Sequence, residues 1–532
     1  MHRHVFLICS ILLLAACGSD DSSTEPAAVE PQVDTPEAAV EANPTDGINW
    51  FDGSVDEAFA EAKESGKPVF LYWGAVWCPP CHAISATVFK SPEFVQRSEL
   101  FVPVYLDGDE EDAQAYGEKF GVLGYPTMIV FDSDGNELTR IPGGIDLQAY
   151  ANILDVTLSN GSSVSNLLAT VMTGTADLSA VDCTLLAYYS WGQDPAILAD
   201  VDSAEAFDRM YAACPSELAA ERSILYLSWL NAALDATDAG GNSAPLSEQQ
   251  REEALRHIAD VLASADLIKA NIFTVLFSGP KFVAALTAPG SAERDHVAAS
   301  FDSAFDTVAN DESVYKRERI YTLAGKMRFE RMDNEEAEIS DALKQEIREM
   351  VVWADESTPS VYERQPIINA LGNVLNEAGM DDVAKPLLIA ELERSNQPYY
   401  YMPSLADIEQ RAGNNEKALE WLKAAYDQTK GPATRFQWGY YYLAGLVEMA
   451  PDNVDLIHAT TVGLIAELQQ SNSFHQRPKS QLGRLENYLR EWGETDGNGA
   501  ALDAIRQSVL EVCTRVVEAP SREVCESFLA AV

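Results

Sequence analysis

Residues 69–82 read VFLYWGAVWCPPCH, an apolar run of strand length that ends in Cys78-Pro79-Pro80-Cys81. Two thiols separated by two residues, at the junction of a strand and a helix, form a dithiol redox pair. The two prolines fit the first turn of a helix, where a missing N–H costs little, so Cys78 is expected at the helix N-cap. Free N–H groups and the helix dipole favour a thiolate there. We therefore expect Cys78 to attack a disulfide and Cys81 to resolve the intermediate.

The flanking residues alternate between strand-like and helix-like patterns. Ser54 and Glu57 form a capping box, Gly66 ends the helix that follows, and Asp134-Gly135 marks a hairpin turn. The expected order is β-α-β-α-β-α-β-β-α. Strands are expected at 48–51, 69–75, 101–106, 128–131 and 137–141, and helices at 54–65, 79–97 with a bend near 91–92, 109–120 and 147–158.

Three further motifs stand in register with the cysteine pair: GKPVFL at 66–71, GYPT at 124–127 and FDSDG at 131–135. Together they resemble the thioredoxin superfamily over residues 47–160. The likeness is greatest to the periplasmic thioredoxin-like domain of DsbD-type disulfide-interchange reductases. The resemblance implies a cis peptide bond before Pro126, in a loop with Tyr125 and Thr127 that pairs with the backbone of an incoming polypeptide. It also implies that Trp77 covers one side of the site.

One position departs from that family. Many thioredoxins carry a buried carboxylate six residues before the first cysteine, where it assists proton transfer, but this chain has Tyr72 there. A tyrosine titrates too high to be a ready base near neutral pH. The proton acceptor is therefore water, His82 or a further residue, and His82 itself is expected on the surface of its helix.

The cysteine motif has competing interpretations. Cys78-Pro-Pro-Cys81-His82 also matches the pattern for c-type haem attachment, but the surrounding strands argue against a small helical haem domain. Zinc would need two further ligands, and the sequence offers no second C-x-x-C and no paired histidines. A thioredoxin fold also serves as a binding module without redox chemistry. Because both cysteines and Trp77 are present, we expect an active dithiol without a metal or another cofactor.

The first residues have the composition of an export signal. A short basic stretch precedes an apolar segment at 5–14, and the segment ends in Leu-Ala-Ala-Cys17. Small residues before a cysteine resemble a bacterial lipobox, so residues 1–16 are interpreted as a lipoprotein signal peptide and Cys17 as the lipidation site. The alternative is an ordinary signal peptide that contains Cys17. By resemblance to enterobacterial sorting, Gly18 after Cys17 favours the outer membrane over the inner one.

The next segment and the overall charge limit the partners. Residues 17–46 are rich in Pro, Ala and acidic residues and lack aromatic ones, so they are expected to form a disordered acidic tether. The chain of 532 residues carries a formal charge of −46. Such an acidic surface repels phosphate backbones, which excludes nucleic acid as a main partner.

Four of the eight cysteines belong neither to the signal, the lipid anchor nor the redox pair: Cys183, Cys214, Cys513 and Cys525. In an oxidising compartment they predict two structural disulfides, for which three connectivities are open. Closeness in sequence favours Cys183–Cys214 and Cys513–Cys525. Buried free thiols are the alternative.

Residues 161–532 show apolar positions at helical spacing throughout. Two segments that lie 34 residues apart align Ala384 with Ala418 and Leu388 with Leu422. This period resembles that of tetratricopeptide repeats, so we expect an α-helical, partly repeat-like region. Aromatic clusters at 399–401 and 438–442 are interpreted as packing between helices, with a concave peptide-binding surface as the alternative. We find no second catalytic motif in this region.

The sequence therefore predicts an α/β thioredoxin-like domain followed by a large all-α, partly repeat-like region. The function it favours is that of a lipid-anchored periplasmic thiol–disulfide oxidoreductase. Its partners would be protein dithiols and disulfides, with a membrane reductase as the candidate electron donor. The alternative is an adaptor or assembly lipoprotein that uses the thioredoxin fold and the helical region to bind proteins.

Overall fold

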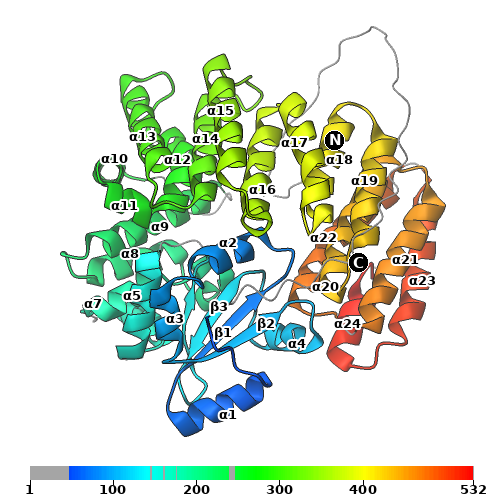
Figure 1. Ribbon diagram of the computed structural model, residues 1–532, viewed down its shortest axis with the longest axis horizontal. Coiled ribbons are helices and arrows are strands. Elements are labelled where there is room, and N and C mark those ends of the chain that lie inside the picture. Colours follow the sequence, from blue (N-terminus) through cyan, green and yellow to red (C-terminus); the bar gives the residue numbers. More distant parts are fainter. Residues whose placement is uncertain are drawn as a thin grey trace.

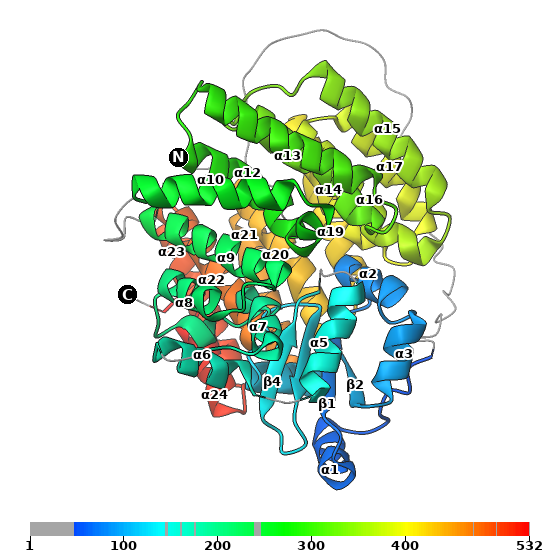
Figure 2. The same ribbon diagram turned by 90° about the vertical axis from the view of Figure 1, so that its left-hand side faces the viewer.

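The computed structural model describes residues 47–143, 147–159, 162–174, 177–238, 246–471, 473–495 and 497–530. An α/β domain lies inside an arc of helices that runs from α6 on one side to α24 on the other (Figures 1 and 2). The expected signal peptide, Cys17 and the acidic tether fall outside the described residues. In the part of the chain that is described, no helix is both long and apolar enough to cross a membrane.

A four-stranded mixed sheet forms the centre of the α/β domain, in the order β2-β1-β3-β4. β1 runs parallel to β2, and β3 is antiparallel to both β1 and β4. The strands are β1 (Val69–Gly74), β2 (Val102–Asp107), β3 (Thr127–Phe131) and β4 (Glu137–Ile141). The helices are α1 (Val55–Ser65), α2 (Pro79–Thr87), α3 (Pro92–Ser98), α4 (Glu111–Lys119) and α5 (Leu147–Ser159).

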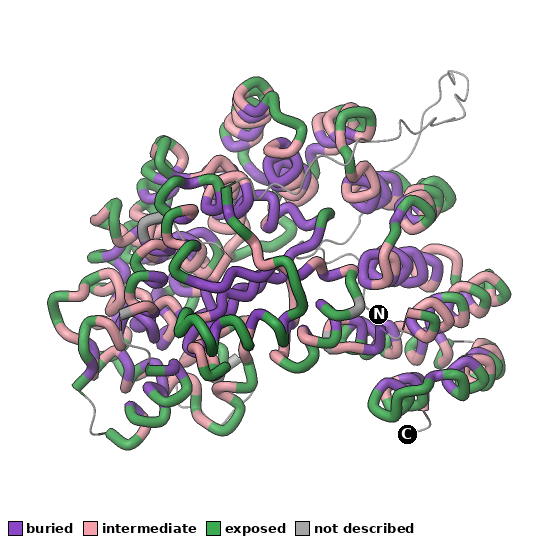
Figure 3. Tube along the Cα trace, turned by 60° about the horizontal axis from the view of Figure 1, so that its bottom comes forward, coloured by how far each residue is buried: buried purple, intermediate pink, exposed green. Residues whose placement is uncertain are grey.

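Strand β1 is buried along its whole length because helices cover both faces of the sheet (Figure 3). Phe70 and Tyr72 pack into a cluster that includes residues of α3 and α5, whereas Leu71 and Trp73 pack into one with α1 and α4. Successive side chains of a strand point to opposite faces, so a strand that is covered on both sides reads as an unbroken apolar run. This arrangement holds the end of β1, and the cysteine pair that follows it, on a rigid support.

Two expected elements were wrong in detail. Residues 48–51 form no strand: Phe51 N donates to Pro103 O at 2.7 Å, but Pro103 has no N–H with which to extend a ladder. The single bent helix expected at 79–97 is two helices, α2 and α3. The second begins afresh at Pro92, because the Ser91 hydroxyl accepts the N–H of Phe94 at 3.1 Å and caps a new N-terminus.

Beyond α5, the described residues form helices, short 3₁₀ turns and the loops that join them. The helices are α6 (Val164–Met172), α7 (Ala180–Ala187), α8 (Ser203–Ala213), α9 (Ala219–Asp238), α10 (Glu248–Leu262), α11 (Ala265–Ala270), α12 (Ile272–Leu286), α13 (Ala292–Asn310), α14 (Lys316–Glu330), α15 (Asp341–Ser357), α16 (Val361–Ala378), α17 (Asp381–Arg394), α18 (Met402–Arg411), α19 (Asn415–Gln428), α20 (Pro432–Met449), α21 (Val454–Gln470), α22 (Gln476–Glu494), α23 (Gly499–Cys513) and α24 (Ala519–Ser527). Short 3₁₀ turns are η1 (Trp191–Gln193), η2 (Pro195–Leu198) and η3 (Pro398–Tyr400).

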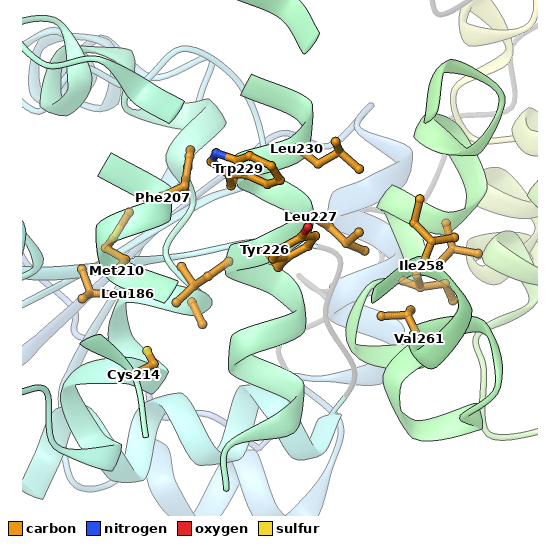
Figure 4. Packing of buried hydrophobic residues seen from close by; sticks show 14 of the residues in the cluster. Leu186, Phe207, Met210, Cys214, Tyr226, Leu227, Trp229, Leu230, Ile258 and Val261 are labelled. Carbon is orange, nitrogen blue, oxygen red and sulfur yellow. The ribbon is translucent and has the colours of Figure 1, made fainter. Parts of the chain in front are cut away.

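Three large apolar clusters stabilise this helical region, and they lie within residues 164–314, 320–408 and 406–529. Figure 4 shows part of the first cluster, where Leu227 of α9 lies between Met210 of α8 on one side and Ile258 of α10 on the other. The two segments 34 residues apart occupy equivalent places: Ala384 in α17 and Ala418 in α19 are both fully buried. The likeness to tetratricopeptide repeats stays a prediction.

Two disulfides lie inside these clusters. Cys183 of α7 is bonded to Cys214 at the end of α8, and Cys513 of α23 is bonded to Cys525 of α24. These are the pairs that closeness in sequence favours. The Cys183–Cys214 bond spans 31 residues of the chain and the Cys513–Cys525 bond spans 12.

Candidate active site

The cysteine pair lies at the N-terminus of α2, directly after β1. Cys78 is the N-cap, and its Sγ accepts the N–H of Cys81 at 3.2 Å. Because Pro79 and Pro80 have no N–H, that of Cys81 is the first one the helix can offer. Cys78 and Cys81 are bonded to each other, with their Cα atoms 5.2 Å apart. In the reduced protein, the same N–H and the helix N-terminus favour a thiolate at Cys78.

The loop before β3 meets the cysteine pair. The peptide bond between Tyr125 and Pro126 is cis. Trp77, Cys78 and Cys81 form a small apolar cluster against which Tyr125 packs, and the rings of Trp77 and Tyr125 are 6.3 Å apart at 64°. Thr127 is fully buried, and its hydroxyl donates to Gly124 O at 2.7 Å. Thr127 therefore stabilises the shape of the loop, whereas Trp77 and Tyr125 form the wall of the site.

The helical region supplies side chains to the same site. Gln365 of α16 donates its Nε2 to Trp77 O at 3.0 Å. Tyr400 of η3 stacks on the Trp77 ring with centroids 6.5 Å apart at 22°, and Arg477 of α22 places its Cζ 4.8 Å from the centre of that ring. No sequence pattern marks Gln365 or Arg477 as part of the site. The aromatic cluster at 399–401 was a signal, but Tyr400 packs on the α/β domain and not only between helices.

His82 is buried, so its expected place on the helix surface was wrong. Tyr362 of α16 stacks on the imidazole with ring centroids 4.3 Å apart, and His82 Nε2 lies 2.8 Å from Val76 O. Burial lowers the pKa of His82 to about 4, although the oxygens of Val76 and Gln365 favour the protonated ring. The ring is therefore neutral at pH 7, with its proton on Nε2 facing the carbonyl and an acceptor at Nδ1.

Tyr72 does not replace the family's buried carboxylate as a base. It is fully buried, and burial raises the pKa of its phenol far above the usual range. Two carboxylates, Asp107 and Asp109, follow one another at the end of β2, and Asp107 pairs in register with Gly74 of β1. Burial raises the pKa of both. These groups lie at the same end of the parallel strands as the dithiol, and a raised pKa brings a carboxyl closer to the range useful for proton transfer.

Comparison with known proteins places the α/β part of the chain. Residues 55–157 match the thioredoxin-like domain family. The chain is 36% identical over 104 residues to thiol:disulfide interchange protein DsbD of Cronobacter sakazakii, which is 19% of this chain and 18% of the relative. It is 32% identical over 104 residues, with the same coverage of both chains, to thiol:disulfide interchange protein DsbD 1 of Pseudomonas aeruginosa. The chain spans about a fifth of the length of the curated relatives it matches. Residues 55–157 are thus a thioredoxin-like domain, as the cysteine, GYPT and hairpin motifs predict.

Proposed function

We propose that the protein is a thiol–disulfide oxidoreductase of the bacterial cell envelope that exchanges disulfides with protein substrates. The observation that carries the proposal is the N-cap position of Cys78, with the N–H of Cys81 on its sulfur and the Tyr125–Pro126 loop beside it. We propose the organisation as a signal peptide (1–16), a tether (17–46), a thioredoxin-like domain (47–160) and a helical region (161–532). The similarity to interchange proteins supports the reaction class.

The reaction uses the two sulfurs in turn. The Cys78 thiolate attacks one sulfur of a substrate disulfide, forms a mixed disulfide and releases the other sulfur as a thiolate. The Cys81 thiolate then attacks Cys78 Sγ, which forms the Cys78–Cys81 bond and releases the second substrate thiol. Two electrons pass from the dithiol to the substrate disulfide, and an external dithiol reverses the process in the enzyme. We propose that a membrane reductase supplies that dithiol.

The side chains around the sulfurs have separate tasks in this scheme. Trp77 and Tyr125 form the wall against which the substrate lies, and Pro126 sets the turn of the loop. Cys81 must lose a proton before it attacks, and the candidate acceptors are the neutral imidazole of His82 and the half-buried carboxyl of Asp107. Tyr72 stays protonated throughout, because its phenol is buried.

A trapping experiment tests the proposal. Without Cys81 the mixed disulfide has no internal resolving thiol, so Cys81→Ser should accumulate envelope proteins bound to Cys78. Cys78→Ser is the matched control and should trap none. The wild-type protein should also accelerate the reduction of insulin by dithiothreitol, whereas both variants should not. Absence of adducts together with absence of insulin reduction would refute the oxidoreductase function.

The lipid anchor is a separate proposal with its own test. The lipobox-like sequence before Cys17 supports lipidation at that residue. A diacylated and N-acylated cysteine would hold the protein in the membrane fraction, and we propose the outer membrane because Gly18 follows Cys17. Cys17→Ser should move the protein to the fraction that high-speed centrifugation leaves in solution. Retention of the variant in the membrane pellet would contradict the anchor.

A second function is favoured by one observation, the burial of the cysteine pair. Cys78 and Cys81 are only 2% and 3% exposed. A thioredoxin-like domain that is closed in this way would also suit an adaptor or assembly lipoprotein, in which the helical region binds other proteins. The trapping experiment separates the two, because an adaptor would bind partners equally well with Cys78→Ser.

A further inference from the structure

The face of the thioredoxin-like domain that carries the dithiol is covered by the chain's own helical region. Helix α16 lies over α2 in both ribbon views (Figures 1 and 2), and the two helices are in direct contact. Cys78 is 2% exposed and Trp77 8%. Exchange requires the attacking sulfur to reach a sulfur of the partner in line, so a protein disulfide has no access to Cys78 in this arrangement.

Three segments that are distant in sequence form this cover. The Gln365 side chain of α16 donates a hydrogen bond to the carbonyl oxygen of Trp77, and Tyr400 of η3 stacks on the Trp77 indole. The Arg477 guanidinium of α22 lies within 5 Å of the centres of the Trp77 and Tyr125 rings. The carbonyl taken by Gln365 belongs to the residue next to the attacking cysteine. A side-chain amide therefore holds a backbone group that an extended substrate chain could use.

A fourth contact joins the two parts farther from the sulfurs. Asp109, after β2, accepts the N–H of Thr434 at the start of α20 at 2.8 Å, and it also accepts the Thr434 hydroxyl. Burial raises the pKa of Asp109, whereas the two hydrogen bonds from Thr434 favour its ionised form. The cover thus contacts the domain on two sides of the dithiol, at α2 and after β2.

The cover and the thioredoxin-like domain meet at a joint between two folded parts, because each side has its own core. The clusters on the two faces of the sheet are built almost wholly from residues 48–158, and the large clusters of the helical region from residues 164–529. The joint itself consists of hydrogen bonds, ring contacts and the small apolar cluster of the site, against which Tyr399 and Tyr400 pack. A substrate chain that lies on Trp77 and Tyr125 can replace these contacts, so the joint can open while the large cores of the two parts stay intact.

The other end of the helical region is joined to the domain by apolar packing, since Tyr188 packs against the cluster of α3 and α5, and by hydrogen bonds. Ser190 N donates to Arg140 O of β4 at 3.0 Å, the buried Arg140 donates to Phe120 O and Gln193 O, and Gln193 Nε2 donates to Pro126 O at 2.8 Å. The helices that begin the helical region therefore stay beside β4, the edge strand of the sheet. Helices α14 and α15 share a core with α16, so they would move with it. Motion of the helices from α14 onward relative to that edge would uncover the dithiol while the domain and the first helices stay together.

We propose that the helical region from α16 to α22 is a reversible cover of the redox site, and that a protein disulfide reaches Cys78 only when this cover lifts. The proposal rests on the proposed function for its purpose, since it describes the regulation of the same site. The cover makes the exchange rate depend on the fraction of molecules that are open. A partner that binds the helical region in its open position would activate exchange.

Alkylation of Cys78 measures the opening without turnover. In a Cys81→Ser background, Cys78 is a free thiol without added reductant, so the structural disulfides stay intact. The test variant adds Gln365→Ala and Arg477→Ala. The matched control adds Gln345→Ala and Arg348→Ala on α15, where Gln345 bonds Glu349 of its own helix and Arg348 pairs with Asp382 of α17. Rates are measured with iodoacetamide and with a maleimide carrying a 5-kDa polymer, about the size of a small protein domain.

The test variant should react about tenfold faster than the control, from the loss of one hydrogen bond and of the cation–π contacts of Arg477 with two rings. The alkylation rate of Cys78 should rise by the same factor with both reagents, because both react only after the same opening of the cover. Equal rates in test and control, or a gain with iodoacetamide alone, would overturn the proposal. Gln365→Glu is the second variant: it keeps the side chain's shape but puts an acceptor against Trp77 O, and it should also accelerate both reagents. Because the readout is alkylation, failure of the cover is distinguishable from failure to trap substrates.

Discussion

His82 should titrate far below an ordinary histidine. The imidazole lies between α2 and the Tyr362 ring and is 6% exposed, and burial lowers its pKa from 6.5 to about 4. A shift of that size corresponds to about 3 kcal/mol against the charged ring. Between pH 6.5 and pH 4, His82 binds a proton in the unfolded chain but not in the folded chain. The free energy of unfolding therefore falls as the pH falls through this window, and this loss is absent above pH 6.5.

The assay is an NMR titration of the full chain with ¹³C-labelled histidine. The chain has 7 histidines, and His82→Gln identifies the signal of His82 by its disappearance. Urea unfolding of the wild type and of His82→Gln at pH 7 and pH 4.5 gives the second reading. The wild type should lose up to about 3 kcal/mol more than the variant on acidification.

Tyr362→Ala tests the cause of the shift. Removing the ring that α16 places on the imidazole should raise the pKa of His82 toward 6.5. The matched control is Tyr442→Ala, since Tyr442 stacks on Tyr426 within the helical region at 6.3 Å. A pKa of His82 at or above 6.5 in the wild type, or an equal change with the control variant, would refute the reasoning that α16 desolvates this ring.

Three further predictions concern packing and proton transfer. The double change Cys183→Ala and Cys214→Ala opens a loop of 31 residues and should lower the free energy of unfolding by about 3–4 kcal/mol, measured by urea unfolding; an unchanged value would contradict a bonded pair. Gly439→Ala places a Cβ 2.2 Å from Leu464 Cδ2 and should destabilise by about 1–3 kcal/mol, whereas Gly463→Ala meets nothing within 4 Å and should stabilise by up to about 1 kcal/mol; equal melting temperatures would refute this packing. Tyr72→Phe should leave the pH profile of insulin reduction unchanged, because the buried phenol stays protonated; a shifted profile would show that Tyr72 takes part in proton transfer.

Features that depend on a few neighbouring residues were predictable. The order of strands and helices in residues 55–157 follows from caps, turns and the period of two, as with the capping box of Ser54 and Glu57, whose side chain accepts Ser54 N at 2.8 Å. The exception at 48–51 is also instructive. Its apolar pattern suits a strand, but the partner edge presents Pro103, and a sequence pattern does not say which residue will lie opposite.

Contacts between the α/β domain and the helical region were not predictable. Gln365 and Trp77 are 288 residues apart in the chain, and nothing near Gln365 marks it as a neighbour of a cysteine pair. His82 follows Cys81 on a short helix, and a polar residue there is ordinarily exposed. The burial of His82 depends on which face of α16 lies against α2. Packing over the whole helical region determines that face.

The sequence by itself determined the chemistry of the dithiol. Two cysteines, two prolines and an apolar strand place Cys78 at a helix N-cap, because N–H groups and helix starts are set within one turn of the chain. Only the tertiary structure decided which molecules can reach the sulfur of Cys78. Access depends on α16, η3 and α22 meeting on the same face, and that meeting is the sum of many weak contacts between segments that the sequence keeps far apart.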